Sequence, residues 1–119
     1  MDRRTLFAVF AGGCLGTLIR AGLLEALPPD PGQWPWPTFA ANAIGTFALG
    51  LLTARPPASP HGHALWSTGF CGALTTFSTL QLELFDMLEA GDVALAAGYA
   101  GASLVAGLAA VALGLRSAR

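Results

Sequence analysis

The stretch GALTTFSTL, residues 72–80, places four hydroxyl side chains inside an otherwise apolar run. Thr75, Thr76, Ser78 and Thr79 cover most of the circumference of a helix, so bonds back to the preceding turn do not explain their clustering. Two glycines just upstream lower helix stability further. The composition favours a broken helix, although a kinked helix that binds no ligand is an alternative. In a membrane, a break is tolerated only inside protein or beside water. Its free carbonyls suit a small hard cation, and its hydroxyls suit a small anion.

The composition around this stretch is that of a membrane protein. Of 119 residues, 54% are hydrophobic and only 11% are charged, and the mean hydropathy is +0.59. Soluble domains usually carry about a quarter charged residues. The net charge of −1 argues against a nucleic-acid-binding surface. We see no paired nucleophile and base, and therefore expect no enzyme.

Four apolar segments are long enough to cross a bilayer, which needs about 20 residues per helix. They cover residues 5–27, 38–54, 65–88 and 93–115, with proline-rich loops after the first two. Together they make residues 1–119 a single all-α membrane domain with four transmembrane helices, the third broken near its centre.

The arginines predict how these spans are oriented. Four spans put both termini and the middle loop on one side of the membrane, which then carries Arg3, Arg4, Arg55, Arg116 and Arg119. The other loops carry only Glu25, Asp30, Glu89 and Asp92. The positive-inside rule therefore predicts that both termini are cytoplasmic.

Small residues predict where the helices touch. Gly12 and Gly16 form a G-x-x-x-G in the first span, and the second and fourth spans also carry several glycines. Such residues let helix backbones approach in lipid. Four short helices leave little interior in a monomer, so we expect a homo-oligomer or a partnership with a related chain.

Polar residues inside the spans are candidates for function because they are costly in lipid. Each also has a structural explanation. Arg20 can snorkel to the interface, Asn42 can make an interhelical hydrogen bond, and Glu83 can be solvated near a helix end. Tyr99 and Ser103 share a face of the fourth span, where Ser103 can bond to its own helix.

Three segments carry a family resemblance: GGCLGTLIR (12–20), TFAANAIGTFALGLL (38–52) and GFCGALTTFSTLQLELF (69–85). They resemble the Fluc/CrcB family of fluoride channels. The resemblance implies an antiparallel dimer of four-helix subunits with two fluoride pores and a structural Na⁺ at the dimer centre. It also implies passive export of fluoride across the bacterial inner membrane, which lowers fluoride toxicity.

The resemblance assigns roles to particular residues. The carbonyls of Gly72 and Thr75 match the sodium ligands. The implied fluoride pore contains Asn42, Phe77, Ser78, Thr79, Tyr99 and Ser103. The implied electrostatic and vestibule residues are Arg20, Glu83 and Thr38. The chemistry is consistent: amide and hydroxyl donors can replace the water of a small anion, and a ring edge is weakly positive.

Two features depart from the family pattern. Leu80 stands where the family motif has a second phenylalanine, and all five arginines outside the spans fall on one side. Both suggest one half of a heterodimer with a related chain, whereas a homodimer that tolerates Leu80 is the alternative. A small multidrug-type transporter is less favoured, because the first span offers Arg20 rather than an embedded carboxylate. A non-transporting membrane subunit is the remaining rival.

Overall fold

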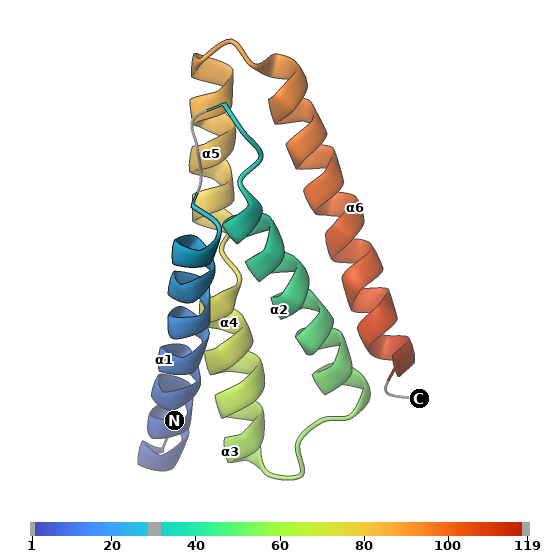
Figure 1. Ribbon diagram of the computed structural model, residues 1–119. Coiled ribbons are helices and arrows are strands. Elements are labelled where there is room, and N and C mark those ends of the chain that lie inside the picture. The colour runs from blue at the N-terminus through green and yellow to red at the C-terminus, as the bar shows by residue number, and fades with distance from the viewer. Residues whose placement is uncertain (1, 29–31, 118–119) are drawn as a thin grey trace.

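The computed structural model describes residues 2–28 and 32–117, and the described chain is helical apart from short connections (Figure 1). Its elements are α1 (Arg3–Ala26), α2 (Trp36–Ala54), α3 (Pro60–His63), the π-helix η1 (Ala64–Cys71), α4 (Gly72–Leu74), α5 (Phe77–Glu89) and α6 (Val93–Ser117). The helices α1, α2 and α6 overlap three of the predicted spans. The third predicted span, residues 65–88, falls on η1, α4 and α5.

Three of these helices are long and apolar enough to cross a membrane: α1, α2 and α6. In the part of the chain that the structure describes, no segment from α3 to α5 reaches that length alone, since α5 has 13 residues and η1 has 8. The structure is therefore that of an all-helical, multi-pass membrane protein.

The helical run from α3 is interrupted at two threonines. Thr75 (φ −79°, ψ 149°) and Thr76 (φ −148°, ψ 109°) have extended backbones between α4 and α5. Before the interruption, η1 is wound as a π-helix, a rare form that is frequently found at functional sites. The interruption leaves backbone groups of two helix ends near mid-molecule, where other helices have to satisfy them.

The long helices pack in two pairs, with α1 along η1 and α2 along α6 (Figure 1). Glycines allow both contacts. A Cβ atom at Gly12 would overlap the Leu65 carbonyl, and one at Gly50 would lie 2.6 Å from the Val111 carbonyl oxygen. In contrast, a Cβ at Gly13 would meet no atom within 4 Å. The glycine-rich faces are thus true helix contacts, but only at selected positions.

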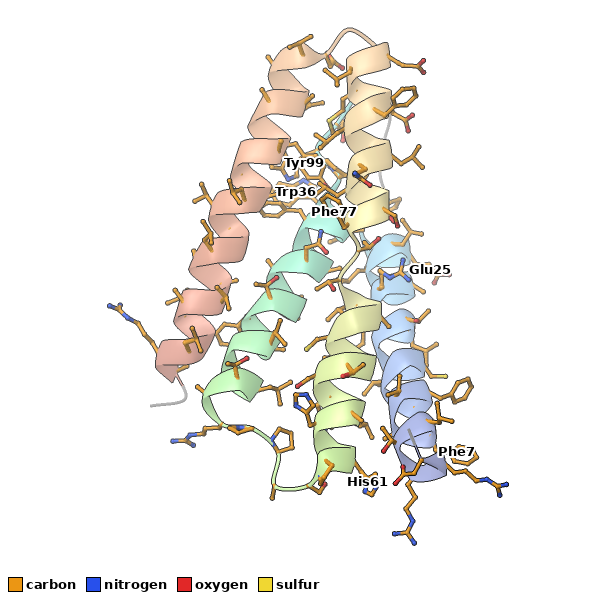
Figure 2. The ribbon with its side chains drawn as sticks, turned by 180° about the vertical axis from the view of Figure 1, so that it is seen from behind. Phe7, Glu25, Trp36, His61, Phe77 and Tyr99 are labelled. Atoms are coloured by element: carbon orange, nitrogen blue, oxygen red, sulfur yellow. The ribbon has the colours of Figure 1, made fainter. Side chains whose placement is uncertain are left out.

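Little of the molecule is a closed core. Among the described residues, only Leu74 and Tyr99 are large side chains that are completely buried. Large apolar side chains such as Phe7 (Figure 2) project outward, and the total accessible surface is 7358 Å². A compact soluble chain of this mass would expose about 6,100 Å². The outer surface of the bundle therefore needs lipid or another subunit to cover it.

Basic residues gather at one end of the molecule. The first turn of α1, the end of α2 and the last turn of α6 lie at the same end (Figure 1) and carry Arg3, Arg4, Arg55 and Arg116. The opposite end, where α5 ends and α6 begins, carries Glu89 and Asp92, whereas Glu25 near the end of α1 lies at about mid-height of the molecule (Figure 2). Arg119 and Asp30 lie outside the described residues.

Candidate functional site

Asn42 holds the interruption between α4 and α5 through a pair of hydrogen bonds. The Thr76 amide donates to Asn42 Oδ1 at 2.7 Å, and Asn42 Nδ2 donates to the Thr76 carbonyl at 3.3 Å. The side chain thus pairs with the extended backbone as a neighbouring strand would. Because Nδ2 carries two hydrogens, one N–H remains after this pairing.

Two further contacts secure the end of α4. Arg20 donates from Nε to the Ala73 carbonyl at 3.0 Å. Thr75 donates through both its amide and its hydroxyl to the Cys71 carbonyl, at 3.0 and 2.9 Å. The arginine of α1 is therefore half-buried against a helix C-terminus, where a cation is favourable.

The start of α5 is capped by its own threonines. Thr76 accepts a hydrogen bond from the Thr79 amide at 3.3 Å, and its hydroxyl contacts the Thr79 hydroxyl at 2.8 Å. This is an N-cap, which compensates for the missing helical partners. Two of the four hydroxyls whose clustering predicted a break, those of Thr76 and Thr79, thus cap the helix that begins after it.

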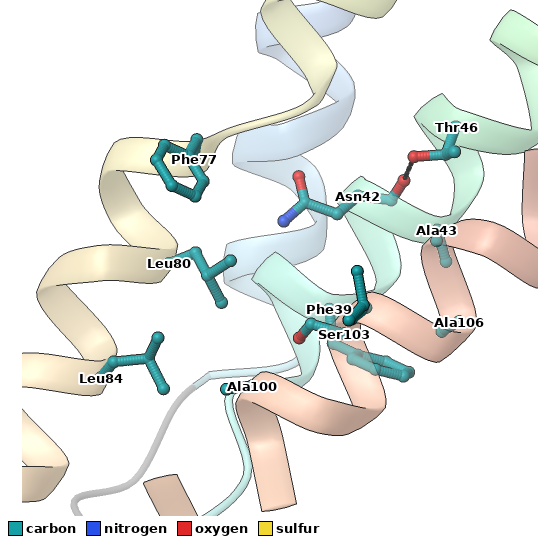
Figure 3. Close-up of a pocket in the computed structure, with 12 residues that line it drawn as sticks. Phe39, Asn42, Ala43, Thr46, Phe77, Leu80, Leu84, Ala100, Ser103 and Ala106 are labelled. Carbon is teal, nitrogen blue, oxygen red and sulfur yellow. Dashed lines mark hydrogen bonds between the residues drawn. The ribbon is translucent and has the colours of Figure 1, made fainter. Parts of the chain in front are cut away.

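A cavity of ≈ 340 Å³ lies beside the interruption, between α2, α5 and α6 (Figure 3). Its polar lining residues are Asn42, Thr46 and Ser103, although Thr46 donates its hydroxyl to the Asn42 carbonyl. Phe77 of α5 and Asn42 of α2 flank the cavity, and Ser103 faces it from α6 (Figure 3). The Ser103 oxygen is buried and has no hydrogen-bond partner in the described residues.

Leu80 and Leu84 supply the apolar wall of this cavity on α5. Leu80 is the position where the family pattern has a second phenylalanine. Its side chain packs against the cluster of Met87, Ala96 and Tyr99. Phe77, in contrast, is 71% exposed in the single chain and is free to contact a second molecule.

Glu83 is held by hydroxyl groups from two other helices. Thr38 Oγ1 of α2 donates to Glu83 Oε2 at 2.9 Å, and Tyr99 OH of α6 donates to Glu83 Oε1 at 2.8 Å. Thr38 is buried and Tyr99 is fully buried, so the carboxylate is bound within the bundle. Both hydroxyl hydrogens are committed to this acid.

A second cavity, of ≈ 260 Å³, lies on the other side of Thr76. Arg20, Thr38 and Thr79 line it together with Thr17, which the sequence did not single out. The two cavities are both bounded by the residues that hold the interruption. The first is lined by amide, hydroxyl and apolar groups, and the second by several threonine side chains and the guanidinium of Arg20.

The remaining predicted residues lie apart from these cavities. Ser78 is exposed and contributes to neither lining. Gly72 is exposed with open space over its Cα, and Thr75 packs with its methyl group against Gly45. The sequence did not indicate that the Thr76 backbone is the hydrogen-bond partner of Asn42. It also did not indicate the group of packed aromatic rings formed by Trp34, Trp36, Phe39 and Tyr99.

The fold and the site define a small helical membrane protein with a polar cavity beside an interrupted helix. Residues 7–115 match the family described as CrcB-like protein, Camphor Resistance (CrcB). The chain is 50% identical to "Fluoride-specific ion channel FluC 1" of Mycolicibacterium paratuberculosis over 122 residues, covering 99% of this chain and 92% of the relative. It is 43% identical to "Fluoride-specific ion channel FluC" of Bordetella bronchiseptica over 117 residues, covering 94% and 89%. The chain belongs to this CrcB/FluC family.

Proposed function

We propose that this protein is a fluoride-selective ion channel that lets fluoride leave the cytoplasm and so lowers its toxicity. The cavity between α2, α5 and α6 is the observation that carries this function. It offers the unpartnered Ser103 hydroxyl and the remaining N–H of Asn42 between apolar walls. Family membership supports the choice of anion, since the relatives are named fluoride-specific channels.

The cavity suits a small anion because its donors are few and fixed. Fluoride holds its water tightly and gives it up only where hydrogen-bond donors replace that water. The Asn42 amide is such a donor, and its pairing with the Thr76 backbone fixes its orientation in advance. The Phe77 ring edge adds a weakly positive contact. Conduction also requires that each contact is weak enough to release the ion. No step needs a catalytic group.

We further propose that η1, α4 and α5 together form the third of four transmembrane spans, with both termini in the cytoplasm. The gathering of Arg3, Arg4, Arg55 and Arg116 at one end supports this orientation. The bacterial inner membrane follows from the family. The interruption then lies within the membrane, where Asn42 and Arg20 satisfy its backbone groups.

The working unit in this proposal is an antiparallel dimer. The exposed Phe77, which lines the cavity, supports a second subunit on this side of the bundle. The one-sided arginines favour an alternative in which a related chain of opposite charge bias is the partner. A homodimer is the simpler arrangement, and the chain tested alone distinguishes the two.

Fluoride efflux from liposomes that contain only this purified chain tests the function. We expect a fluoride electrode to report efflux after the membrane potential is clamped, and no comparable chloride efflux. Flux from the chain alone would establish a homodimer. Absence of flux from folded protein would contradict the homodimeric channel, and recovery on adding a related chain would establish the heterodimer.

A structural sodium ion is proposed at the dimer centre, on the carbonyls of Gly72 and Thr75. These carbonyls accept no hydrogen bond from the residues that the structure describes, and Gly72 is exposed. Free carbonyl oxygens are suitable ligands for a hard cation. The ion would add a fixed positive charge near the anion path.

Removing sodium should therefore weaken the channel. We expect fluoride efflux to fall by about 10-fold or more when N-methylglucamine replaces Na⁺ during purification and assay, since a charge that offsets the buried anion is lost. Re-addition of Na⁺ serves as the control and should restore the flux. Equal efflux in thoroughly sodium-free and sodium-containing samples would contradict the sodium site.

A further inference from the structure

We infer that the indole N–H of Trp34 is an additional fluoride-binding donor at the outer end of the anion path. This inference rests on the proposed fluoride-channel function and extends it to a residue outside the cavity lining. Trp34 lies in the connection between α1 and α2, at the end of the bundle opposite the arginines.

The first observation is a count of unused donors. Within residues 2–28 and 32–117, two buried side-chain polar atoms have no hydrogen-bond partner: Ser103 Oγ and Trp34 Nε1. Buried polar groups are usually satisfied, and leaving one unpaired is costly. Ser103 faces the proposed fluoride cavity. The Trp34 indole N–H, like the Ser103 hydroxyl, therefore needs an acceptor from outside the described residues.

The second observation is the position of Trp34 relative to that cavity. Its ring packs edge-on against Phe39, with ring centroids 5.6 Å apart, and Phe39 lines the cavity. Leu80 and Leu84 also line the cavity and pack with Trp34 in one apolar cluster. Trp34 therefore lies directly behind the cavity wall rather than at a separate surface.

The third observation links the two unused donors through α6. Ser103 and Tyr99 are one helical turn apart, about 6 Å along the axis. The Tyr99 ring contacts the Trp34 ring edge-on, with centroids 5.3 Å apart. Tyr99 cannot serve the anion itself in this arrangement, because its hydroxyl donates to Glu83. Among the described residues, Trp34 thus carries the unused donor next to Ser103, separated from it by the Tyr99 ring.

The electrostatics also favour a donor at this place. Glu83 presents a carboxylate within the bundle, and its repulsion would raise the barrier for fluoride as the ion passes Tyr99. An indole N–H beyond Tyr99 compensates for part of that repulsion. As a neutral single donor, it releases the ion more readily than a cation would, as conduction requires.

The direct test follows the indole N–H itself in the intact chain reconstituted in lipid nanodiscs. The chain has three tryptophans, so selective ¹⁵N labelling should give three indole resonances, and Trp34→Phe assigns one of them. We expect sodium fluoride to shift the Trp34 indole proton saturably, and sodium chloride at equal ionic strength to leave it unchanged. The indoles of Trp36 and Trp66 are internal controls. A Trp34 resonance that ignores fluoride in protein that conducts it would overturn the inference.

The functional test uses Trp34→Phe, which keeps an aromatic ring for Tyr99 but removes the N–H. Trp36→Phe is the matched control, because Trp36 is 56% exposed and packs in the same aromatic group. We expect efflux at low fluoride to fall by about 10-fold for Trp34→Phe only, the scale of one hydrogen bond to an ion. Wild-type flux in Trp34→Phe contradicts the inference. Absence of flux in the wild-type chain contradicts the homodimeric channel instead, and the resonance shift then decides Trp34 separately.

Discussion

Asn42→Asp is expected to abolish fluoride efflux while leaving a folded protein. The carboxylate can still accept from the Thr76 amide, but it cannot donate to the Thr76 carbonyl, and two acceptors then face each other. It also loses the remaining N–H that faces the cavity and adds a negative charge there. A lost hydrogen bond to a charged group is worth about 1.5–3 kcal/mol, so the combined losses predict a decrease of at least about 100-fold.

Liposome efflux with matched protein amounts measures this effect. Thr53→Ala is the control on the same helix, since Thr53 is exposed and bonds only to the Leu49 carbonyl one turn away. It should conduct as the wild type does. Substantial efflux from Asn42→Asp would mean that the amide neither holds the interruption nor meets the ion, and the cavity would lose its central donor.

The second large effect concerns packing, and two adjacent glycines provide the comparison. Gly12→Ala should destabilise the protein by about 3 kcal/mol or more, because the new Cβ overlaps the backbone carbonyl of Leu65 rather than a movable side chain. Gly13→Ala has open space and should be neutral or slightly stabilising, since alanine favours helix by up to about 1 kcal/mol.

The apparent melting temperature of each variant in detergent, followed by the loss of the monodisperse size-exclusion peak, compares the pair. Gly12→Ala should melt well below Gly13→Ala. Equal melting temperatures would show that α1 does not approach η1 as closely as the structure has it. The same logic applies to Gly50, where α2 meets α6.

Membrane character and helix positions could be predicted from the sequence because each depends on local composition. The apolar runs, the proline-rich loops and the arginine distribution need no knowledge of neighbours. The clustered hydroxyls of residues 75–79 also predicted a break, since too many polar groups on one helix turn conflict with lipid. In the structure, the backbone is extended at Thr75 and Thr76.

The partners of the polar residues could not be predicted in this way. Asn42 lies 34 residues from Thr76, and Arg20 lies 53 residues from Ala73, so sequence spacing carries no information about these pairs. The same limit applies to Glu83, for which the sequence left two interpretations, a solvated acid near a helix end or an electrostatic and vestibule residue. In the structure it accepts hydrogen bonds from Thr38 and Tyr99 on two other helices.

The sequence by itself thus determined that this protein lies in a membrane, where its helices fall along the chain and, through its motifs, to which family it belongs. Tertiary structure alone decided which donors remain unused. The sequence left Ser103 able to bond within its own helix and gave no hydrogen-bonding role to the Trp34 indole, yet in the part of the chain that the structure describes both polar atoms are buried without a hydrogen-bond partner. The physical reason is that a donor stays unused only when every neighbouring acceptor is already bonded or too distant. The positions of those acceptors depend on how the helical segments pack and not on any local sequence pattern.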